Sequence, residues 1–228
     1  MSLILPMLTN GGSVPDAAGP TLTYLGSDFI DNGDGSSWTT TSFTASESGL
    51  FIAMCLSVNG SARTWTDTTI GGVSGTLVED TAGTYGNQRP QAEIRTRVIT
   101  SGSYAITISG QVTGRSVGVA AYLLTGYASA TPTATGTDGG SADVTSRAVT
   151  FTVPANGVAL YVGGSQSNSS GYTLSSPVTD TKSLDDGGGS YSYGGIAGQI
   201  VAATQLTSQT VTMTTASAEA CLVGAAWS

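Results

Sequence analysis

The stretch Ser116–Tyr127, SVGVAAYLLTGY, decides the fold class. Alternate residues of a strand lie on opposite faces, and here both faces are apolar. One face carries Val117, Val119, Ala121 and Leu123, and the other carries Gly118, Ala120, Tyr122 and Leu124. A run of about nine residues before a Thr-Gly turn suits a central strand, covered on both sides, better than a helix. Cys221–Trp227 (CLVGAAW) repeats the pattern, so the sequence predicts a large all-β core.

The composition agrees with an all-β fold. A chain of 228 residues can bury a sizeable core, as one β-sandwich domain or as two small ones. Only 10% of the residues are charged, and the 39% that are hydrophobic occur in short alternating runs. Glycine, asparagine, aspartate and serine separate these runs, which is typical of many strands joined by tight turns. No window has a sustained helical period.

Outside the central stretch, Leu50–Val58 is a second strand with two apolar faces. Gln91–Ile99 has the alternation of a half-buried strand. Its predicted inward residues are Ala92, Ile94, Thr96 and Val98, and its predicted outward residues are Glu93, Arg95 and Arg97. Asp28–Ser37 (DFIDNGDGSS) is interpreted as an acidic turn, because its spacing of oxygen ligands fails the calcium-loop pattern.

Two segments of the chain repeat. Ser42–Met54 aligns with Thr150–Val162, and Ile106–Ile108 aligns with Val211–Met213, at offsets of 108 and 105 residues. The sequence therefore contains two halves, about 21–132 and 147–228, that are either tandem sandwiches or parts of one larger two-sheet domain. Because the linker is short and both closing strands have two apolar faces, we expect one β-sandwich domain over 21–228.

Residues 1–20 lack strand alternation and contain Pro6, Pro15 and Pro20, so they are predicted to form an extended arm. The arm has an apolar segment, whose residues are Leu3, Ile4, Leu5, Met7 and Leu8. These side chains are candidates for docking on a neighbouring subunit or on a capsid. The alternative is that they cover a sheet of the same chain.

The net charge of −8 argues against two classes of partner. Nucleic-acid binding needs a basic surface to displace counterions, and an anionic membrane would repel this chain. The N-terminal apolar run lacks a basic region and is broken at Pro6, which makes it a poor signal peptide. No run approaches the roughly 20 apolar residues of a membrane-spanning helix. We therefore expect synthesis in the cytoplasm.

The sequence offers little catalytic chemistry. It has no histidine, no zinc-binding spacing of cysteines, no GxSxG elbow and no phosphate-binding GxxxxGK loop. The acid pairs Glu79-Asp80 and Asp185-Asp186 are interpreted as solvated turn residues, since neighbouring strand residues point apart. Cys55 and Cys221 lie in apolar strands and are expected to be free thiols. We predict no enzymatic activity, no cofactor and no metal.

One loop suggests a binding site. Asp185–Gly195, DDGGGSYSYGG, carries Tyr191 and Tyr193 among glycines and hydroxyl groups. Aromatic rings beside polar donors make adaptable contacts in binding loops, and such rings can stack on sugars. These tyrosines are candidates for glycan contact, with packing on the sheet beneath them as the alternative.

Several segments, in fixed order, resemble jelly-roll-like β-sandwich modules of tailed-phage virion proteins and of bacterial surface proteins. They are GLFIAMCLSV (49–58), TTIGGVSGTLVEDTA (68–82), EIRTRVITSGSYAITISG (93–110), SVGVAAYLLTGYASATP (116–132) and ACLVGAAW (220–227). The resemblance implies a two-sheet sandwich and a non-enzymatic structural protein of a virion. Such a protein is assembled in the host cytoplasm and attached to the capsid exterior as a decoration (cement), head-fibre or spike component. It implies contacts with the major capsid protein or other virion proteins, and a homo-oligomer. A tail-fibre module or a carbohydrate-binding module is the alternative.

Overall fold

The computed structural model describes residues 19–33, 37–59, 66–82, 89–110, 115–140, 143–165, 172–184 and 194–228. These residues form 19 strands and no helix. The strands are β1 (Thr21–Gly33), β2 (Ser37–Thr39), β3 (Phe43–Ala45), β4 (Gly49–Asn59), β5 (Asp67–Ile70), β6 (Val73–Ser74), β7 (Thr76–Ala82), β8 (Arg89–Ile99), β9 (Gly102–Tyr104), β10 (Ile106–Ser109), β11 (Arg115–Thr125), β12 (Ala134–Gly139), β13 (Val144–Val153), β14 (Gly157–Ser165), β15 (Thr173–Leu174), β16 (Thr179–Ser183), β17 (Gly194–Ala202), β18 (Leu206–Ala218) and β19 (Ala220–Trp227). The all-β prediction is confirmed. No helix in the described part of the chain is long and apolar enough to cross a membrane.

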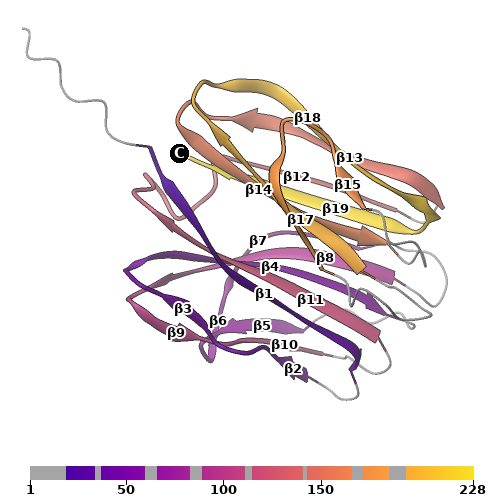
Figure 1. The fold of residues 1–228 in the computed structure, drawn as a ribbon, viewed down its shortest axis with the longest axis horizontal. Helices are drawn as coiled ribbons and strands as arrows, with labels where there is room; N and C mark the ends of the chain where they lie inside the picture. Colours follow the sequence, from indigo (N-terminus) through magenta and orange to yellow (C-terminus); the bar gives the residue numbers. More distant parts are fainter. Residues whose placement is uncertain are drawn as a thin grey trace, which may run out of the picture.

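The strands form two large sheets and three small ones, and all their pairings are antiparallel. The first large sheet has the order β1-β11-β4-β8-β7, and the second has the order β12-β19-β14-β17-β16. The small sheets are β2-β10-β5-β6, β3-β9 and β13-β18-β15. Figure 1 shows them as stacked layers, with the two large sheets in the middle and the small sheets outside. The packing is that of a β-sandwich.

The two halves of the chain have the same strand order. In the first large sheet β1 pairs with β11, and β11 pairs with β4. In the second large sheet β12 pairs with β19, and β19 pairs with β14, so each half repeats the same order. The aligned segments coincide with equivalent strands: β4 with β14, and β10 with part of β18. A repeat read from a few shared residues therefore extends to the sheet topology.

The large sheets face each other across a shared core. On this face β4 contributes Leu50, Ile52, Met54 and Leu56, and β14 contributes Val158, Leu160 and Val162. Trp227 and Tyr122 are among the largest fully buried side chains of this core. Gly195 of β17 marks a close approach, because a side-chain carbon at that position would collide with Leu56. Packing between the halves thus covers most of one face of each large sheet.

The outer face of each large sheet is covered by small sheets of its own half. In the first half Phe51, Cys55 and Val119 pack against Ile70 and Ile106. In the second half Tyr161 and Leu222 pack against Phe151, Val211 and Met213. Strands of the large sheets are thereby buried on both faces. The predicted placement of Ser116–Tyr127 is confirmed: β11 lies between β1 and β4, and its side chains enter both the shared core and the first outer core.

Two local predictions were wrong. The expected acidic turn at Asp28 is a continuation of β1, which is paired with β11 as far as Gly33. Asp28 instead accepts hydrogen bonds from the backbone N (2.6 Å) and Oγ1 (3.0 Å) of Thr41. In β8, Glu93 was expected to face solvent but is 2% exposed, while Val98 was expected inside but is 62% exposed. Because the first large sheet lies between two layers, the polar face of β8 is covered as well.

Deletion of residues 2–12 is expected to leave the fold intact. The buried clusters of the described residues lie between Phe43 and Trp227, so the deletion removes none of their side chains. The far-UV spectrum should be unchanged, and the melting temperature should fall by no more than about 5 °C, which corresponds to a change of roughly 1.5 kcal/mol for a chain of this size. Circular dichroism checks both. Precipitation or loss of the sheet signal would show that the arm belongs to the folded core.

Candidate functional site

The candidate site residues from the sequence lie outside the described residues. This applies to the arm residues Leu3, Ile4, Leu5, Met7 and Leu8, and to the loop residues Tyr191 and Tyr193. Of the acid pairs, Asp185-Asp186 is outside as well. Glu79 and Asp80 lie within the edge strand β7, opposite Ile94 and Glu93 of β8 respectively, so the interpretation of this pair as turn residues was wrong. The docking and glycan predictions remain predictions.

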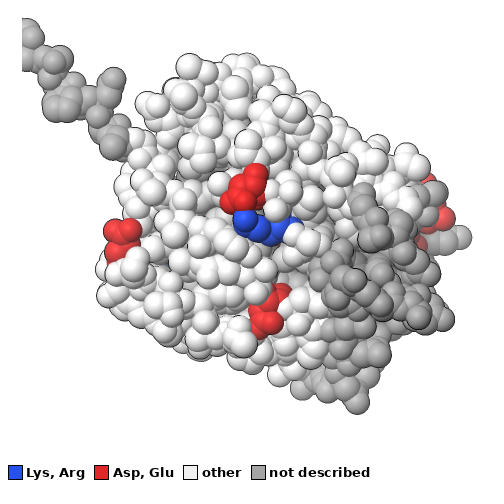
Figure 2. Space-filling model, viewed as in Figure 1, with Lys and Arg blue, Asp and Glu red and all other residues white. Residues whose placement is uncertain are grey.

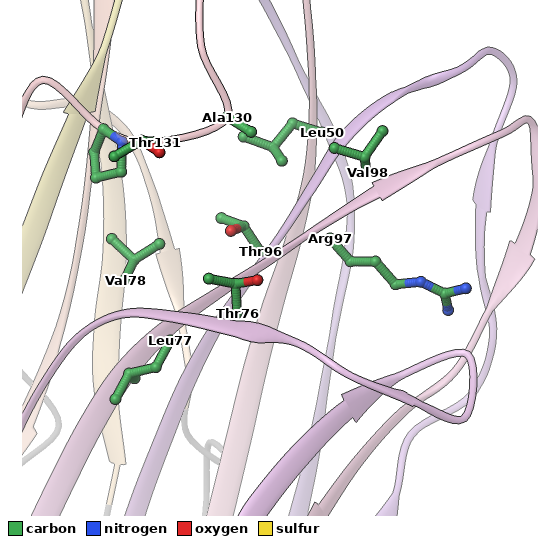
Figure 3. Close-up of a pocket in the computed structure, with 10 residues that line it drawn as sticks. Leu50, Thr76, Leu77, Val78, Thr96, Arg97, Val98, Ala130 and Thr131 are labelled. Atoms are coloured by element: carbon green, nitrogen blue, oxygen red, sulfur yellow. The ribbon is translucent and has the colours of Figure 1, made fainter.

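An apolar groove of about 320 Å³ lies at one end of the first large sheet. It is formed by β7, β8, the start of β4 and the segment 130–132 that follows β11 (Figure 3). Its apolar lining consists of Leu50, Leu77, Val78, Val98, Ala130 and Pro132. Leu77 is 44% exposed and Val98 is 62% exposed, whereas Leu50 is buried. The groove therefore presents large apolar side chains to solvent.

Two features of the backbone shape the groove. The pairing of β7 with β8 shifts between Leu77 and Glu79, so Val78 is the extra residue of a β-bulge, a device that re-aims side chains at sheet edges. The segment that follows β11 is held on the end of β19: Trp227 Nε1 donates to the Ala130 carbonyl (3.2 Å), and Thr133 N donates to the Ala226 carbonyl (2.7 Å). These bonds fix Ala130 and its neighbours as one wall.

The polar groups of the groove are nearly all neutral. They are the hydroxyls of Thr76, Thr96 and Thr131, together with the guanidinium of Arg97. Figure 3 shows the Arg97 side chain extending away from the other lining residues. Its guanidinium donates to the Ile70 carbonyl and lies 5.8 Å from the centre of the Tyr104 ring. The groove is suited to an uncharged, apolar ligand or chain segment.

A buried polar cluster lies on the opposite face of β8. Glu93 accepts hydrogen bonds from Thr68 Oγ1 and from Arg95 Nε (3.1 Å), and Arg95 NH1 also donates to the Gly75 carbonyl (3.1 Å). Asp67 lies 4.0 Å from Arg95 NH1. The cluster joins β8 to β5 of the small sheet, and its groups satisfy one another. We therefore assign it a structural role.

Burial raises the pKa of the Glu93 carboxyl group, and the negative charge of Asp80 adds to this. The hydrogen bonds and charge of Thr68 and Arg95 oppose the shift without cancelling it. Since the pKa is higher in the folded chain than in the unfolded one, the folded chain binds more protons over the interval between the two values. The stability that proton binding by Glu93 contributes is then fully present below about pH 4.5, and it is lost as the pH rises through the folded pKa.

We therefore expect the free energy of unfolding of the wild type, relative to that of Glu93→Gln, to fall as the pH is raised from about 4.5 towards neutrality. The comparison with Glu93→Gln removes the contribution of the other carboxylates. Urea unfolding at a series of pH values measures the difference. A difference that stays constant or grows with pH would contradict the raised pKa.

Both cysteines are free and buried, as predicted from their apolar surroundings. Burial raises the pKa of the Cys55 thiol, and it raises that of Cys221 to about 12. A thiol with so high a pKa is protonated at neutral pH and is a poor nucleophile. Neither cysteine is a candidate for covalent chemistry.

The surface carries few charges. On the face in Figure 2 the acidic and basic side chains are scattered over a mainly uncharged surface. Within the described ranges no group of three or more histidine, cysteine, aspartate or glutamate residues is arranged to hold a metal ion. The apolar groove is accordingly the best-defined candidate binding site of the described chain.

The fold and the groove define a class: an all-β protein of two stacked β-sandwich halves with an exposed apolar groove. No family model matches the sequence, and comparisons with curated proteins and with solved structures give no significant match. The resemblance to phage virion modules remains a prediction from the segments quoted above.

Sequence reasoning missed the groove. Val98 was predicted to face inward in the strand Gln91–Ile99, and inward strand residues are usually core residues; Leu77 was assigned no role. The available signal was the position of Val98, one residue before the end of its strand. Which strand ends lie uncovered depends on the stacking of the large sheets, and that stacking does not follow from strand patterns.

Proposed function

We propose that the chain is a non-enzymatic structural protein of a phage-like virion, attached to the capsid exterior as a decoration, head-fibre or spike component. Three observations support this: the two stacked sandwiches, the sparse charge of the surface in Figure 2, and the mapping of every resembling segment onto strands of the large or small sheets or their connections. Its partners would be the major capsid protein or other virion proteins, including further copies of this chain.

The observation that carries the proposal is the exposed apolar groove. Isolated apolar side chains on a surface need no explanation, but a concave site with Leu77 and Val98 at its mouth indicates contact with another chain segment. Elsewhere the large sheets are largely covered, on one face by each other and on the other by the small sheets of their own half. A layered fold of this kind suits a structural protein that binds other protein chains.

The strand order supports the jelly-roll part of the proposal. In each large sheet the first strand of the half (β1 or β12) lies beside the last strand (β11 or β19). The last strand in turn lies beside β4 or β14. Pairing of sequence-distant strands within one sheet of a sandwich is a Greek-key feature, which the jelly rolls of capsid proteins share. The large sheets of both halves share this order.

Immunogold labelling tests the proposal. Antibodies against the purified chain are applied to intact particles from the source culture, and we expect label distributed over the capsid exterior. A matched control uses the same antibodies preabsorbed with the chain. Label confined to the tail would favour the tail-fibre alternative, and particles without label would contradict the proposal.

The carbohydrate-binding alternative has a separate test, because its residues are Tyr191 and Tyr193 rather than the groove. A glycan array probed with the wild type and with the double variant Tyr191→Ala/Tyr193→Ala measures it. Binding to defined glycans that the double variant loses would favour attachment to host glycans. Under the structural proposal neither protein is expected to bind.

A further inference from the structure

Four cross-strand partners relate the base of the N-terminal arm to the groove and give the distance between them, although the middle two, Leu124 and Leu50, are buried beneath the second large sheet. Leu22 of β1 is paired with Leu124 of β11, Leu124 with Leu50 of β4, and Leu50 with Val98 of β8. Cross-strand partners point to the same face of a sheet, so the four side chains form one row. Leu22 comes three residues after the first described residue, Gly19, and Val98 lies in the groove.

The distance along this row is short compared with the reach of the arm. Three strand spacings separate β1 from β8, a span of about 14 Å. Ten residues, 9–18, separate the apolar segment Leu3–Leu8 from Gly19. For a chain of ten residues the root-mean-square end-to-end distance is about 16–19 Å. Because linker and span match, the effective concentration of the segment at the groove of its own chain is in the millimolar range.

The chemistry of the segment also fits the groove. LILPML carries no charge, and the groove is lined by aliphatic side chains and threonine hydroxyls, with its one guanidinium extending away. We propose that the groove binds the segment Leu3–Leu8 of the same chain, which covers Leu77 and Val98. The inference concerns the isolated chain and does not depend on the virion role. Exchange of the segment between adjacent copies would turn the same contact into a link between subunits.

Thiol labelling of a cysteine at the groove mouth tests the proposal. Val98→Cys is made in the full chain and in the chain lacking residues 2–12, and its rate of reaction with a soluble disulfide reagent is measured. The native cysteines are buried and have raised pKa values, so they contribute little background. With a millimolar effective concentration and a Kd near 0.1 mM, the cysteine in the full chain should react about tenfold more slowly.

Val201→Cys is the matched control. Val201 is 61% exposed, close to the 62% of Val98, but it lies on β17 in the other half of the chain and does not line the groove. Its rate should be equal in the two lengths of chain. A second variant, Leu77→Cys, should show the same difference in labelling rate between the two lengths of chain as Val98→Cys. Agreement of the two variants excludes an effect peculiar to one substitution. Replacing Leu5 and Leu8 with serine in the full chain should restore fast labelling of Val98→Cys.

Each of the other outcomes overturns the proposal. Equal rates at Val98→Cys in both lengths would show that the segment does not cover the groove. Equal protection of Val201→Cys would show nonspecific shielding. Protection that grows with protein concentration would assign the segment to the groove of a second copy, since binding within one chain does not depend on concentration.

Discussion

Replacement of Trp227 with alanine is expected to lower the free energy of unfolding by about 3–5 kcal/mol. Trp227 is fully buried in the core shared by the two large sheets. Its Nε1 also donates to the carbonyl of Ala130, which belongs to the wall of the groove. The substitution removes the largest buried side chain between the halves and leaves a cavity that the rigid sheets cannot close.

The control for this prediction is Val201→Ala, in which an exposed apolar residue of the same half is truncated. It should change stability by no more than about 0.5 kcal/mol. Urea unfolding of both variants is monitored by far-UV circular dichroism, a signal that does not rely on tryptophan. A cost for Trp227→Ala as small as that of the control would mean that the contact between the large sheets contributes little, and that the halves are stable separately.

Replacement of Glu93 with alanine is expected to cost about 3 kcal/mol at neutral pH. The change leaves the Thr68 hydroxyl and Arg95 Nε without their buried acceptor. Arg95 retains the Gly75 carbonyl and the more distant Asp67, so the loss is smaller than for a fully isolated charge. Relief of the burial of the carboxylate offsets part of the cost.

Glu47→Ala is the matched control, because Glu47 is an exposed glutamate of the same half. We expect a change within about 0.5 kcal/mol for this variant. Both variants are compared by chemical denaturation. If Glu93→Ala were as stable as the wild type, the cluster between β8 and β5 would not hold the small sheet on the large one.

The layered core follows from the strand patterns. Two apolar faces in Ser116–Tyr127 and in Cys221–Trp227 require cover on both sides, and the stacking of four layers supplies it. The repeat of Ser42–Met54 in Thr150–Val162 likewise anticipated the common order of the large sheets. In these segments the pattern is dominated by burial, which is the term that decides a β fold.

The burial of Glu93 and the exposure of Val98 could not be predicted in the same way. Alternation distinguishes the two faces of β8, but it does not tell what covers each face. Glu93 is buried because Thr68 and Arg95 satisfy its oxygens. Arg95 is two residues along the same strand, but Thr68 is 25 residues away and leaves no mark on the local pattern. The groove depends on where the segment around Ala130 is fixed by β19, a contact between residues 97 positions apart.

A cryo-EM map of the particle tests the central claim, that this chain is an exterior structural protein of a virion, most directly. The account predicts density on the outer surface of the capsid into which two stacked sandwiches fit, with the large sheets in the middle. The same map shows whether the groove at Val98 is covered by a segment of the same copy. Density for the chain only inside the capsid would contradict the account. Absence of the chain from the purified particles would contradict it as well.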